Sequence, residues 1–259
     1  MNSSIKIIHQ SANFIVVNKP FDLIINSDDP ERQSAFKILQ ETHPELTNSK
    51  LKHGFYILHR LDHATSGILV IPLTKKFVQK ASKSFENGKV TKYYLAILRG
   101  HCQENEYLVN SPIGTDSRTD LKMALSDSEF CVKPKNAETL ISVISRGFYQ
   151  GEPATKVLLN PKTGRRHQLR IHCHSIGHTI VGDYTYSDRQ DTKPKRMYLH
   201  AYYIKIPNEI EDLEIQTEDD LEDGEYETKE IVRQLDVILK LYFSFSSFQK
   251  ETIKENLIV

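Results

Sequence analysis

The strongest candidate for chemistry is a short polar segment that stands between two apolar stretches. Residues 59–67 read His-Arg-Leu-Asp-His-Ala-Thr-Ser-Gly, so a carboxylate, an arginine and two histidines precede the apolar residues 68–71. Side chains alternate along an extended segment, so Arg60 and Asp62 share one side while Leu61 faces the core. Polar residues at the end of a strand are candidates for a functional site. The ordinary alternative is a turn in which the Asp62 carboxylate accepts backbone hydrogen bonds.

A second segment, residues 163–178, opens with a turn and continues at helical spacing. The apolar face of this predicted helix contains Leu169, His172, Cys173 and Ile176. With that face packed inward, Arg165, Arg166 and Arg170 lie near the helix start or on its exposed side. Guanidinium groups placed there bind phosphates or pair with a carboxylate. A solvated basic face without a ligand is the alternative.

Metal chemistry is the least favoured interpretation of these residues. Four histidines fall between positions 167 and 178, but their spacings of five, two and four match no common zinc pattern. We expect His172 and Cys173 to be packed core residues instead. The chain also lacks a phosphate-binding loop, a dinucleotide fingerprint and a serine nucleophile elbow. The sequence therefore predicts chemistry without a cofactor or a metal.

The elements that must position these segments alternate between strand and helix. Residues 5–8 and 14–17 are predicted to form a hairpin, and Ser34 and Thr74 are predicted to cap two helices. Residues 100–136 are predicted to form a connecting insertion. Further strands are predicted at 93–98, 139–144, 154–159 and 198–206.

The charge distribution divides the chain into two parts. The net charge is zero, yet residues 207–259 hold 15 acidic and 5 basic side chains, which leaves 19 acidic and 29 basic in residues 1–206. Such a basic excess suits a polyphosphate partner, and a merely basic soluble surface is the alternative. We expect the acidic run 209–230 to be solvated, and the segment 207–230 to lie near the basic domain and to weaken non-specific binding of such a partner. The amphipathic helix predicted after it aligns Ile231, Val232, Leu235, Ile238, Leu239 and Tyr242.

The spacing of the cysteines and the hydropathy of the chain indicate in which cellular compartment we expect the protein. The three cysteines at positions 102, 131 and 173 show no pairing pattern, and the first thirty residues contain no signal segment. No apolar run approaches the roughly 18 residues that a membrane helix needs. We therefore expect a cytoplasmic protein, with a nuclear location left open, that does not contact a membrane.

Together the two polar segments resemble the RluA family of pseudouridine synthases. The family's hallmark His-Arg-Leu-Asp followed by Thr-Ser-Gly stands here at residues 59–62 and 65–67. The chain is most similar to the eukaryotic RNA pseudouridylate synthase domain-containing members, which have no amino-terminal S4-like module. Residues 207–259 have no recognised counterpart. The resemblance extends over residues 5–206 through Val17-Asn18-Lys19-Pro20, Lys92-Tyr93-Tyr94-Leu95-Ala96, Thr163-Gly164-Arg165 and Gly182-Asp183-Tyr184-Thr185-Tyr186.

The resemblance implies an α+β fold with a bent, largely antiparallel mixed sheet flanked by helices. One catalytic domain would cover residues 1–206 and carry its site in a basic cleft, and residues 207–259 would be an appendage. The implied activity is the isomerisation of uridine to pseudouridine in RNA (rRNA, tRNA or mRNA) without a cofactor. A monomer is the expected state.

The family's site residues are carried over by motif position. Asp62 is implied to be the catalytic carboxylate, Arg165 its ion-pair partner, and Tyr94 the residue against the base. Tyr93 is not chosen because it points to the opposite face of its strand. Arg60 is implied to enter the RNA stack as the uridine flips out, since a stacked base is unreachable.

Three positions depart from the pattern that bacterial members usually show. They are His63-Ala64, Arg166 and Thr179, and none of them removes a catalytic position. Arg166 adds positive charge beside the site, and we expect it to bind the RNA backbone together with Arg170. Substrate choice is expected to differ from that of the bacterial enzymes. The alternatives are a non-catalytic RNA-binding or RNA-chaperone protein and, more remotely, a metal-dependent hydrolase.

Overall fold

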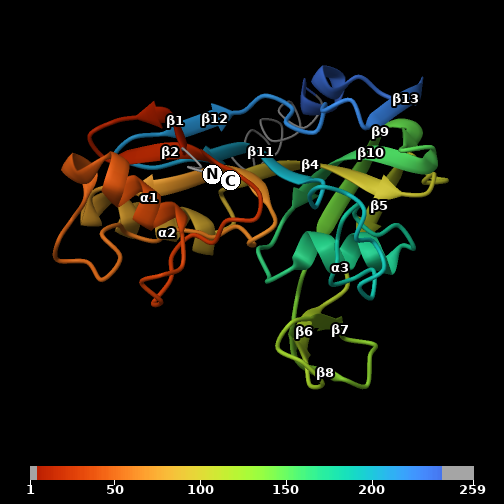
Figure 1. The fold of residues 1–259 in the computed structure, drawn as a ribbon, viewed down its shortest axis with the longest axis horizontal. Coiled ribbons are helices and arrows are strands. Elements are labelled where there is room, and N and C mark those ends of the chain that lie inside the picture. Colours follow the sequence, from red (N-terminus) through yellow and green to blue (C-terminus); the bar gives the residue numbers. More distant parts are fainter. Residues whose placement is uncertain (1–4, 241–259) are drawn as a thin grey trace, which may run out of the picture.

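A ten-stranded sheet runs through the whole length of the molecule (Figure 1). The computed structural model describes residues 5–240. The strands of this sheet are β1 (Lys6–Gln10), β2 (Phe14–Lys19), β3 (Ser66–Pro72), β4 (Thr91–Arg99), β5 (Glu106–Val109), β9 (Thr139–Tyr149), β10 (Glu152–Pro161), β11 (Leu199–Ile206), β12 (Leu213–Gln216) and β13 (Tyr226–Ile231). Their order is β1-β2-β3-β11-β4-β10-β9-β13, with β12 beside β11 and β5 beside β9.

Only the β3–β11 pair is parallel among the strand pairs of this sheet in residues 5–240. The predicted α+β fold with a largely antiparallel mixed sheet is therefore confirmed. This pair also joins distant parts of the sequence, because Ser66 lies opposite His200 and Gly67 opposite Ala201. Gly67 is required there, since its φ is 107° and a Cβ would lie 2.3 Å from the Ala201 carbonyl oxygen.

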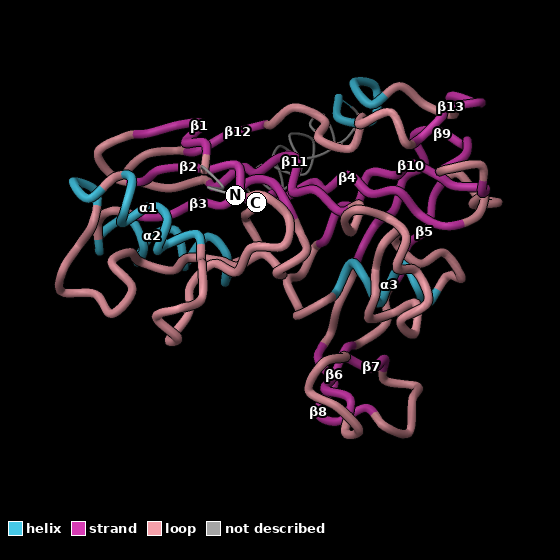
Figure 2. The backbone as a smooth tube through the Cα atoms, viewed as in Figure 1, coloured by secondary structure: helices cyan, strands magenta, loops and turns pink. Residues whose placement is uncertain are grey.

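Three helices lie on one face of the sheet (Figure 2). They are α1 (Ala35–Thr42), α2 (Lys75–Glu86) and α3 (Gln168–Ser175). The side chains of Ser34 and Thr74 accept hydrogen bonds from Lys37 N and Phe77 N, so both predicted caps are confirmed. Helices α1 and α2 cover the half of the sheet that contains β1 to β3, and α3 covers the other half (Figure 1). The part of this face between the two groups of helices carries the candidate site.

Strand β4 runs under this site. Its side chains point alternately to the two faces of the sheet, and this alternation determines whether Tyr93 or Tyr94 faces the helices. Tyr93, Leu95 and Ile97 belong to the core on the face opposite the helices, with Tyr149 and Tyr198. The core beneath α3 contains Ala96 and Leu98 and is joined by Tyr94. Tyr94 is therefore the tyrosine on the helix face, as its position predicted.

The segment 100–136 has more structure than a connecting insertion. It contains β5 and a separate three-stranded sheet of β6 (Ile113–Asp116), β7 (Met123–Leu125) and β8 (Cys131–Lys135). This small sheet projects from the body below α3 (Figure 1). The prediction missed these strands because they are three to five residues long, and periodicity is weak over such lengths.

The predicted boundary at residue 206 does not divide the sheet. Strand β12 pairs with β11, and β13 forms the edge beside β9, so the acidic run is built into the fold. Opposite charges meet across both pairs, since Glu214 lies opposite Lys205 and Glu230 opposite Arg146. Such cross-strand pairs stabilise a sheet. Because β12 and β13 carry charged residues whose partners lie on other strands, their sequence was interpreted as a charged linker.

The acidic run also pairs with cations of the main domain, yet all of its acidic residues stay at least partly exposed, so they keep the contact with solvent that was predicted. Its ion pairs with Lys and Arg of the main domain are Glu209–Lys80, Glu214–Lys205, Asp219–Lys156, Glu222–Lys156, Asp220–Arg196, Asp223–Lys195 and Glu230–Arg146. The prediction that it lies near the basic domain is confirmed. Residues 235–240 are helical, and Leu235, Ile238 and Leu239 pack on the Tyr93 side of the sheet. Ile231 belongs to β13, and Tyr242 lies outside the described residues.

Candidate active site

Asp62 lies in the turn that leads into β3. Its backbone carbonyl accepts a hydrogen bond from Thr65 N at 3.1 Å, and neighbouring Leu61 is buried in the core as predicted. Within residues 5–240 no backbone amide donates to the Asp62 carboxylate, whose side chain is 21% exposed. The carboxylate is therefore not a turn cap, and it faces a cavity of about 340 Å³ between α2 and α3.

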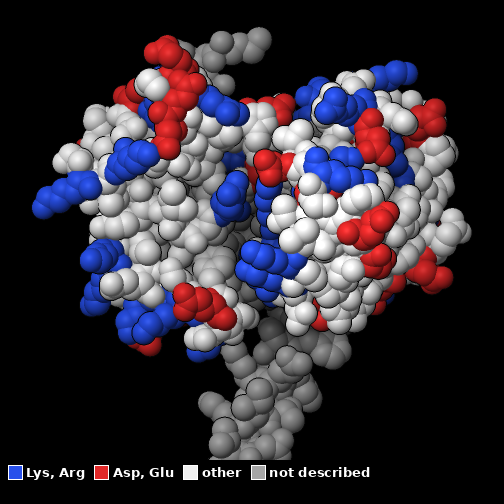
Figure 3. Space-filling model, turned by 90° about the horizontal axis from the view of Figure 1, so that it is seen from below, with Lys and Arg blue, Asp and Glu red and all other residues white. Residues whose placement is uncertain are grey.

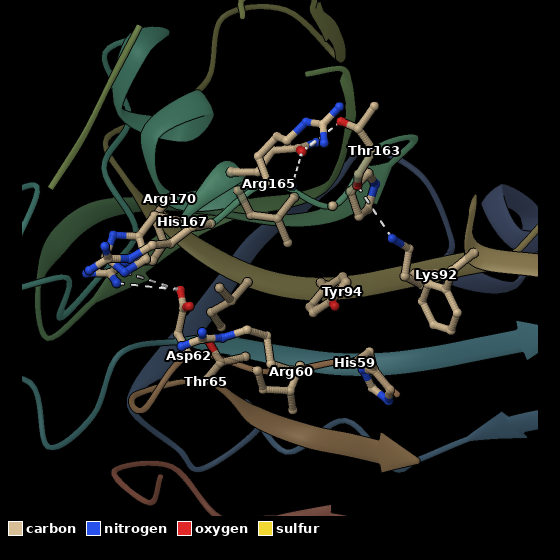
Figure 4. A pocket seen from close by; sticks show the side chains of 18 of the residues that line it. His59, Arg60, Asp62, Thr65, Lys92, Tyr94, Thr163, Arg165, His167 and Arg170 are labelled. Carbon is tan, nitrogen blue, oxygen red and sulfur yellow. Dashed lines mark hydrogen bonds and ion pairs between the residues drawn. The ribbon is translucent and has the colours of Figure 1, made fainter. Parts of the chain in front are cut away.

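The cation beside Asp62 is Arg170, from the first turn of α3. Its Nη1 lies 3.6 Å from Asp62 Oδ2 (Figure 4). Its Nε and Nη2 donate to the two oxygens of Asp183 at 2.7 Å. Arg170 and Asp183 are both buried. Burial acts to lower the pKa of Arg170, but the hydrogen bond to Asp183 and the charges of Asp183 and Asp62 raise it. Arg170 is therefore a fixed positive charge that orients Asp62.

This arrangement corrects two predictions. Arg165 does not pair with Asp62, because its exposed side chain donates from Nε to the Asn136 carbonyl at 2.9 Å. The turn before α3 is closed by Gln168, whose Oε1 accepts from Arg165 N at 2.9 Å and holds that residue on the far wall (Figure 4). Arg170 is not on an exposed face, because its side chain is buried and pairs with Asp183 and Asp62.

His167 is a site residue that the sequence patterns missed. Its Nε2 lies 4.0 Å from Asp62 Oδ2, and its backbone has a φ of 55° at the start of α3. Burial lowers the pKa of His167 to about 4, although the charge of Asp62 acts to raise it. The imidazole is therefore neutral near pH 7 and stands beside the carboxylate without cancelling its charge. In the sequence, the only indication that His167 belongs to the site was its place immediately before Gln168 in the second motif.

The opposite end of the cavity is formed by Tyr94 and Lys92, two positions apart on β4 (Figure 4). Burial and then the charge of Asp62 raise the pKa of Tyr94, so its phenol is neutral. Burial lowers the pKa of Lys92 to about 8, and its Nζ donates to the Thr163 carbonyl at 3.4 Å. The cavity thus joins an aromatic ring, a carboxylate and a partly desolvated amine.

The turn that carries Asp62 is supported from behind by Lys19 at the end of β2. This side chain is fully buried, and its Nζ donates to the carbonyl oxygens of Pro20, Leu23 and His63 at 2.9, 2.8 and 3.1 Å. Burial lowers the pKa of Lys19 to about 7, against the charges of Asp22 and Asp62. Lys19 therefore ties the chain after β2 to the turn that presents the carboxylate.

A larger groove of about 1230 Å³ continues from this cavity and shares Arg60, Asp62, Arg166, His167 and Arg170 with it. Seen from the helix side, cations border a channel between the two halves of the molecule (Figure 3). Ten cations and four carboxylates line the cavity and groove together. The cations are Arg32, Arg60, Lys92, Lys122, Arg165, Arg166, Arg170, Arg189, Lys195 and Arg196.

The predicted RNA-contacting arginines differ in how they are held. Arg60 is exposed, and its guanidinium has no hydrogen bond or ion pair with the described part of the chain. Arg166 is exposed as well and donates from Nη2 to the Asp120 carbonyl at 2.6 Å. His172 is a core residue as predicted, with its ring nitrogens on Thr139 Oγ1 and the Ser111 carbonyl. No cluster of three potential metal-ligating side chains occurs in residues 5–240.

Comparison with known proteins identifies the family. The profile described as RNA pseudouridylate synthase matches residues 13–175. RNA pseudouridylate synthase domain-containing protein 1 of Mus musculus is 43% identical over 222 residues, which cover 83% of this chain and 72% of the relative. The dual-specificity RNA pseudouridine synthase RluA of Yersinia pestis is 32% identical, over 77% of this chain and 91% of the relative. The chain belongs to the RNA pseudouridylate synthase family.

A solved structure agrees with this result. The human RNA pseudouridylate synthase domain-containing 1 protein superposes with a TM-score of 0.81 at 36% identity, over 93% of this chain and 95% of that one. The predicted pseudouridine synthase fold and RluA-type resemblance are therefore confirmed. No helix within residues 5–240 is both long and apolar enough to span a membrane.

Proposed function

We propose that Asp62 is the catalytic carboxylate with which this RNA pseudouridine synthase isomerises uridine. The observation that carries the proposal is the position of Asp62, whose half-buried carboxylate opens into the cavity and is held by a buried arginine. Arg170 gives this carboxylate a buried cationic partner at 3.6 Å that fixes its orientation. The isomerisation breaks the bond from N1 to C1′ and forms one from C5 to C1′. A proton leaves C5 and another joins N1.

The other residues have roles that follow from their positions. Tyr94 offers a neutral aromatic face on which the detached base can be retained, since its hydroxyl is held un-ionised by burial. Arg60 is unpaired and stands where the cavity meets the groove, so it can replace the stacking that a flipped uridine leaves behind. Arg165 and Arg166 border the entrance and supply charge for the phosphate backbone.

The test uses the proton that must leave C5. RNA that carries tritium at uridine C5 releases the label to water only if the uridine is isomerised. We expect release from total cellular RNA by the wild type and none by Asp62→Asn, which keeps the shape of the side chain. Equal release by both proteins would refute the role of Asp62. No release by the wild type from any RNA pool would favour the non-catalytic RNA-binding alternative.

Expectations about the cell and the assembly stay predictions. The basic groove and the family membership support an RNA partner, while a monomeric state, a cytoplasmic or nuclear location, and the absence of a cofactor and a metal remain predictions from the sequence. The identity of the RNA is expected to depend on groove residues outside the cavity, because the cavity itself contains the motif residues.

A further inference from the structure

Two large exposed side chains, one aromatic and one aliphatic, line the groove outside the cavity that contains Tyr94. Tyr184 is 53% exposed and Leu121 is 63% exposed, and both line the groove of about 1230 Å³ that Asp62 also lines. Tyr184 belongs to the loop after Gly182, and Leu121 to the β6–β7 connection. Exposed aromatic rings beside phosphate-binding cations are the usual platform for unpaired bases.

Two cations of the same groove are available to a ligand. Arg32 and Arg189 line it, and neither guanidinium forms a hydrogen bond or ion pair with the described part of the chain. Lys195, by contrast, is paired with Asp223, and Arg196 with Asp220. The unpaired guanidiniums thus stand in the same groove as Tyr184 and Leu121, where a phosphate between successive bases would supply their counter-charge.

The loop that carries Tyr184 is held in a strained shape. Asp188 and Arg189 are consecutive non-glycine residues with φ of 51° and 66°. Arg189 N donates to the Tyr184 carbonyl at 2.9 Å, and Asp188 pairs with Lys122 next to Leu121. Strained backbone persists where surrounding contacts fix it, and it clusters at ligand sites. These contacts hold Tyr184, Arg189 and Leu121 in one fixed arrangement.

We propose that Tyr184, Leu121 and Arg189 form a subsite for an unpaired nucleotide that neighbours the target uridine, with the base on Tyr184 and its phosphate on Arg189. The inference rests on the proposed function, because it takes RNA as the ligand and Asp62 as the centre of the reaction. Stacking on one aromatic side chain is worth about 1–3 kcal/mol per base, or roughly 5- to 150-fold in affinity. The enzyme would therefore prefer uridines whose neighbour is free to unstack.

The first readout is binding of a single-stranded oligouridylate of about ten nucleotides, which needs no knowledge of the natural RNA. We expect Tyr184→Ala to raise the Kd at least fivefold and Tyr184→Phe to stay within twofold of the wild type. Leu121→Ala should weaken binding, whereas Leu108→Ala should not. Leu108 is a matched control because it is 64% exposed and does not line the groove.

The second readout is tritium release from uridine C5 at low RNA concentration, where the same ranking of variants is expected. Wild-type binding and release by Tyr184→Ala would overturn the subsite and leave the role of Asp62 intact. If the wild type releases no tritium while oligouridylate binding still depends on Tyr184, the proposed function fails, and of the subsite only nucleotide binding at Tyr184 stands. Equal losses for Leu121→Ala and Leu108→Ala would also contradict the proposal, because the effect would not be confined to the groove.

Discussion

The guanidinium of Arg170 joins two carboxylates of unequal exposure, with Nη1 3.6 Å from Asp62 and Nε 2.7 Å from Asp183. The Asp183 side chain is fully buried, and the Asp62 side chain is 21% exposed to the cavity. One residue therefore serves both the fold and the chemistry, and the two contributions can be separated by substitution.

Arg170→Met should destabilise the protein strongly and abolish tritium release. Removing one partner of a buried pair leaves an uncompensated charge and costs about 3–5 kcal/mol, here because Asp183 loses its cation. Urea unfolding measures this loss. Arg170→Lys should be more stable than Arg170→Met yet remain slow, since an ammonium cannot reach both carboxylates bidentately. Unfolding free energies equal to that of the wild type would contradict the structural role.

Arg165→Met should behave differently, because the Arg165 side chain is exposed and donates only to the Asn136 carbonyl. Surface substitutions of this kind usually change stability by less than about 0.5 kcal/mol. We expect normal urea unfolding, a raised KM for RNA and a smaller salt dependence of binding, since a phosphate contact is lost. If Arg165→Met lowered kcat as far as Arg170→Met and left KM unchanged, Arg165 would approach Asp62 when RNA binds.

Lys19→Met should lower both stability and activity. The substitution removes the only hydrogen-bond donor found for the Pro20 and Leu23 carbonyl oxygens in the described part of the chain, while the His63 carbonyl still accepts from Leu23 N. The cost is about 1–3 kcal/mol for each group that stays unsatisfied. The substitution also frees the turn that presents Asp62, so kcat should fall more than RNA affinity. Lys37→Met is the matched control, because Lys37 Nζ also donates to a proline carbonyl, that of Pro30, but at an exposed site. Similar losses from both variants would argue against a specific role for Lys19.

Lys92 should make the stability of the wild type rise with pH in the alkaline range. Its folded-state pKa of about 8 lies below the ordinary value of 10.5, so between these pH values the unfolded chain holds a proton that the folded chain does not. Unfolding free energy then rises by up to about 1.4 kcal/mol per pH unit. The destabilisation is fully present below pH 8, where both states are protonated. Lys92→Met should lack this slope relative to the wild type, while Lys50→Met should run parallel to it.

Asp220→Asn should raise RNA affinity at low salt. Asp220 is half exposed and pairs at 2.7 Å with Arg196, a buried cation that lines the groove, so its negative charge lowers the positive potential that attracts phosphate. The gain should disappear at high salt, where such charge effects are screened. Glu209→Gln is the control, because it releases Lys80, which does not line the groove. Ending the chain at Pro207 cannot serve here, since it would remove β12 and β13.

The sequence predicted the fold and the position of the main site well where its signals are local. The hairpin, both helix caps, the Tyr94 face of β4 and the turn at Asp62 all follow from alternation and capping between neighbours. Strands β12 and β13 were not predicted, because their exposed positions carry charges. The cations that pair with these charges, Lys205 and Arg146, belong to other strands.

The errors within the site have the same origin. Arg165 and Arg170 stand five positions apart in one motif, and nothing in their spacing shows which one reaches Asp62. The answer depends on Asp183, which holds Arg170 inside the fold, and on Gln168, which holds the backbone of Arg165 away. The Arg170–Asp183 contact arises only when the chain after α3 has packed against that helix, whereas the Gln168–Arg165 contact forms within the turn that begins α3.

Because β3 pairs with β11, the sheet around the active site can be completed only late in the synthesis of this protein. Strand β3 carries the turn with Asp62, yet its neighbour β11 begins 127 positions after β3 ends, at Leu199. A nascent chain that has emerged only through α3 possesses every residue of the cavity but Leu199 and lacks the strand that joins the two halves. Catalytic competence should therefore appear late on the ribosome, and an unfinished chain would be unable to modify the RNA around it.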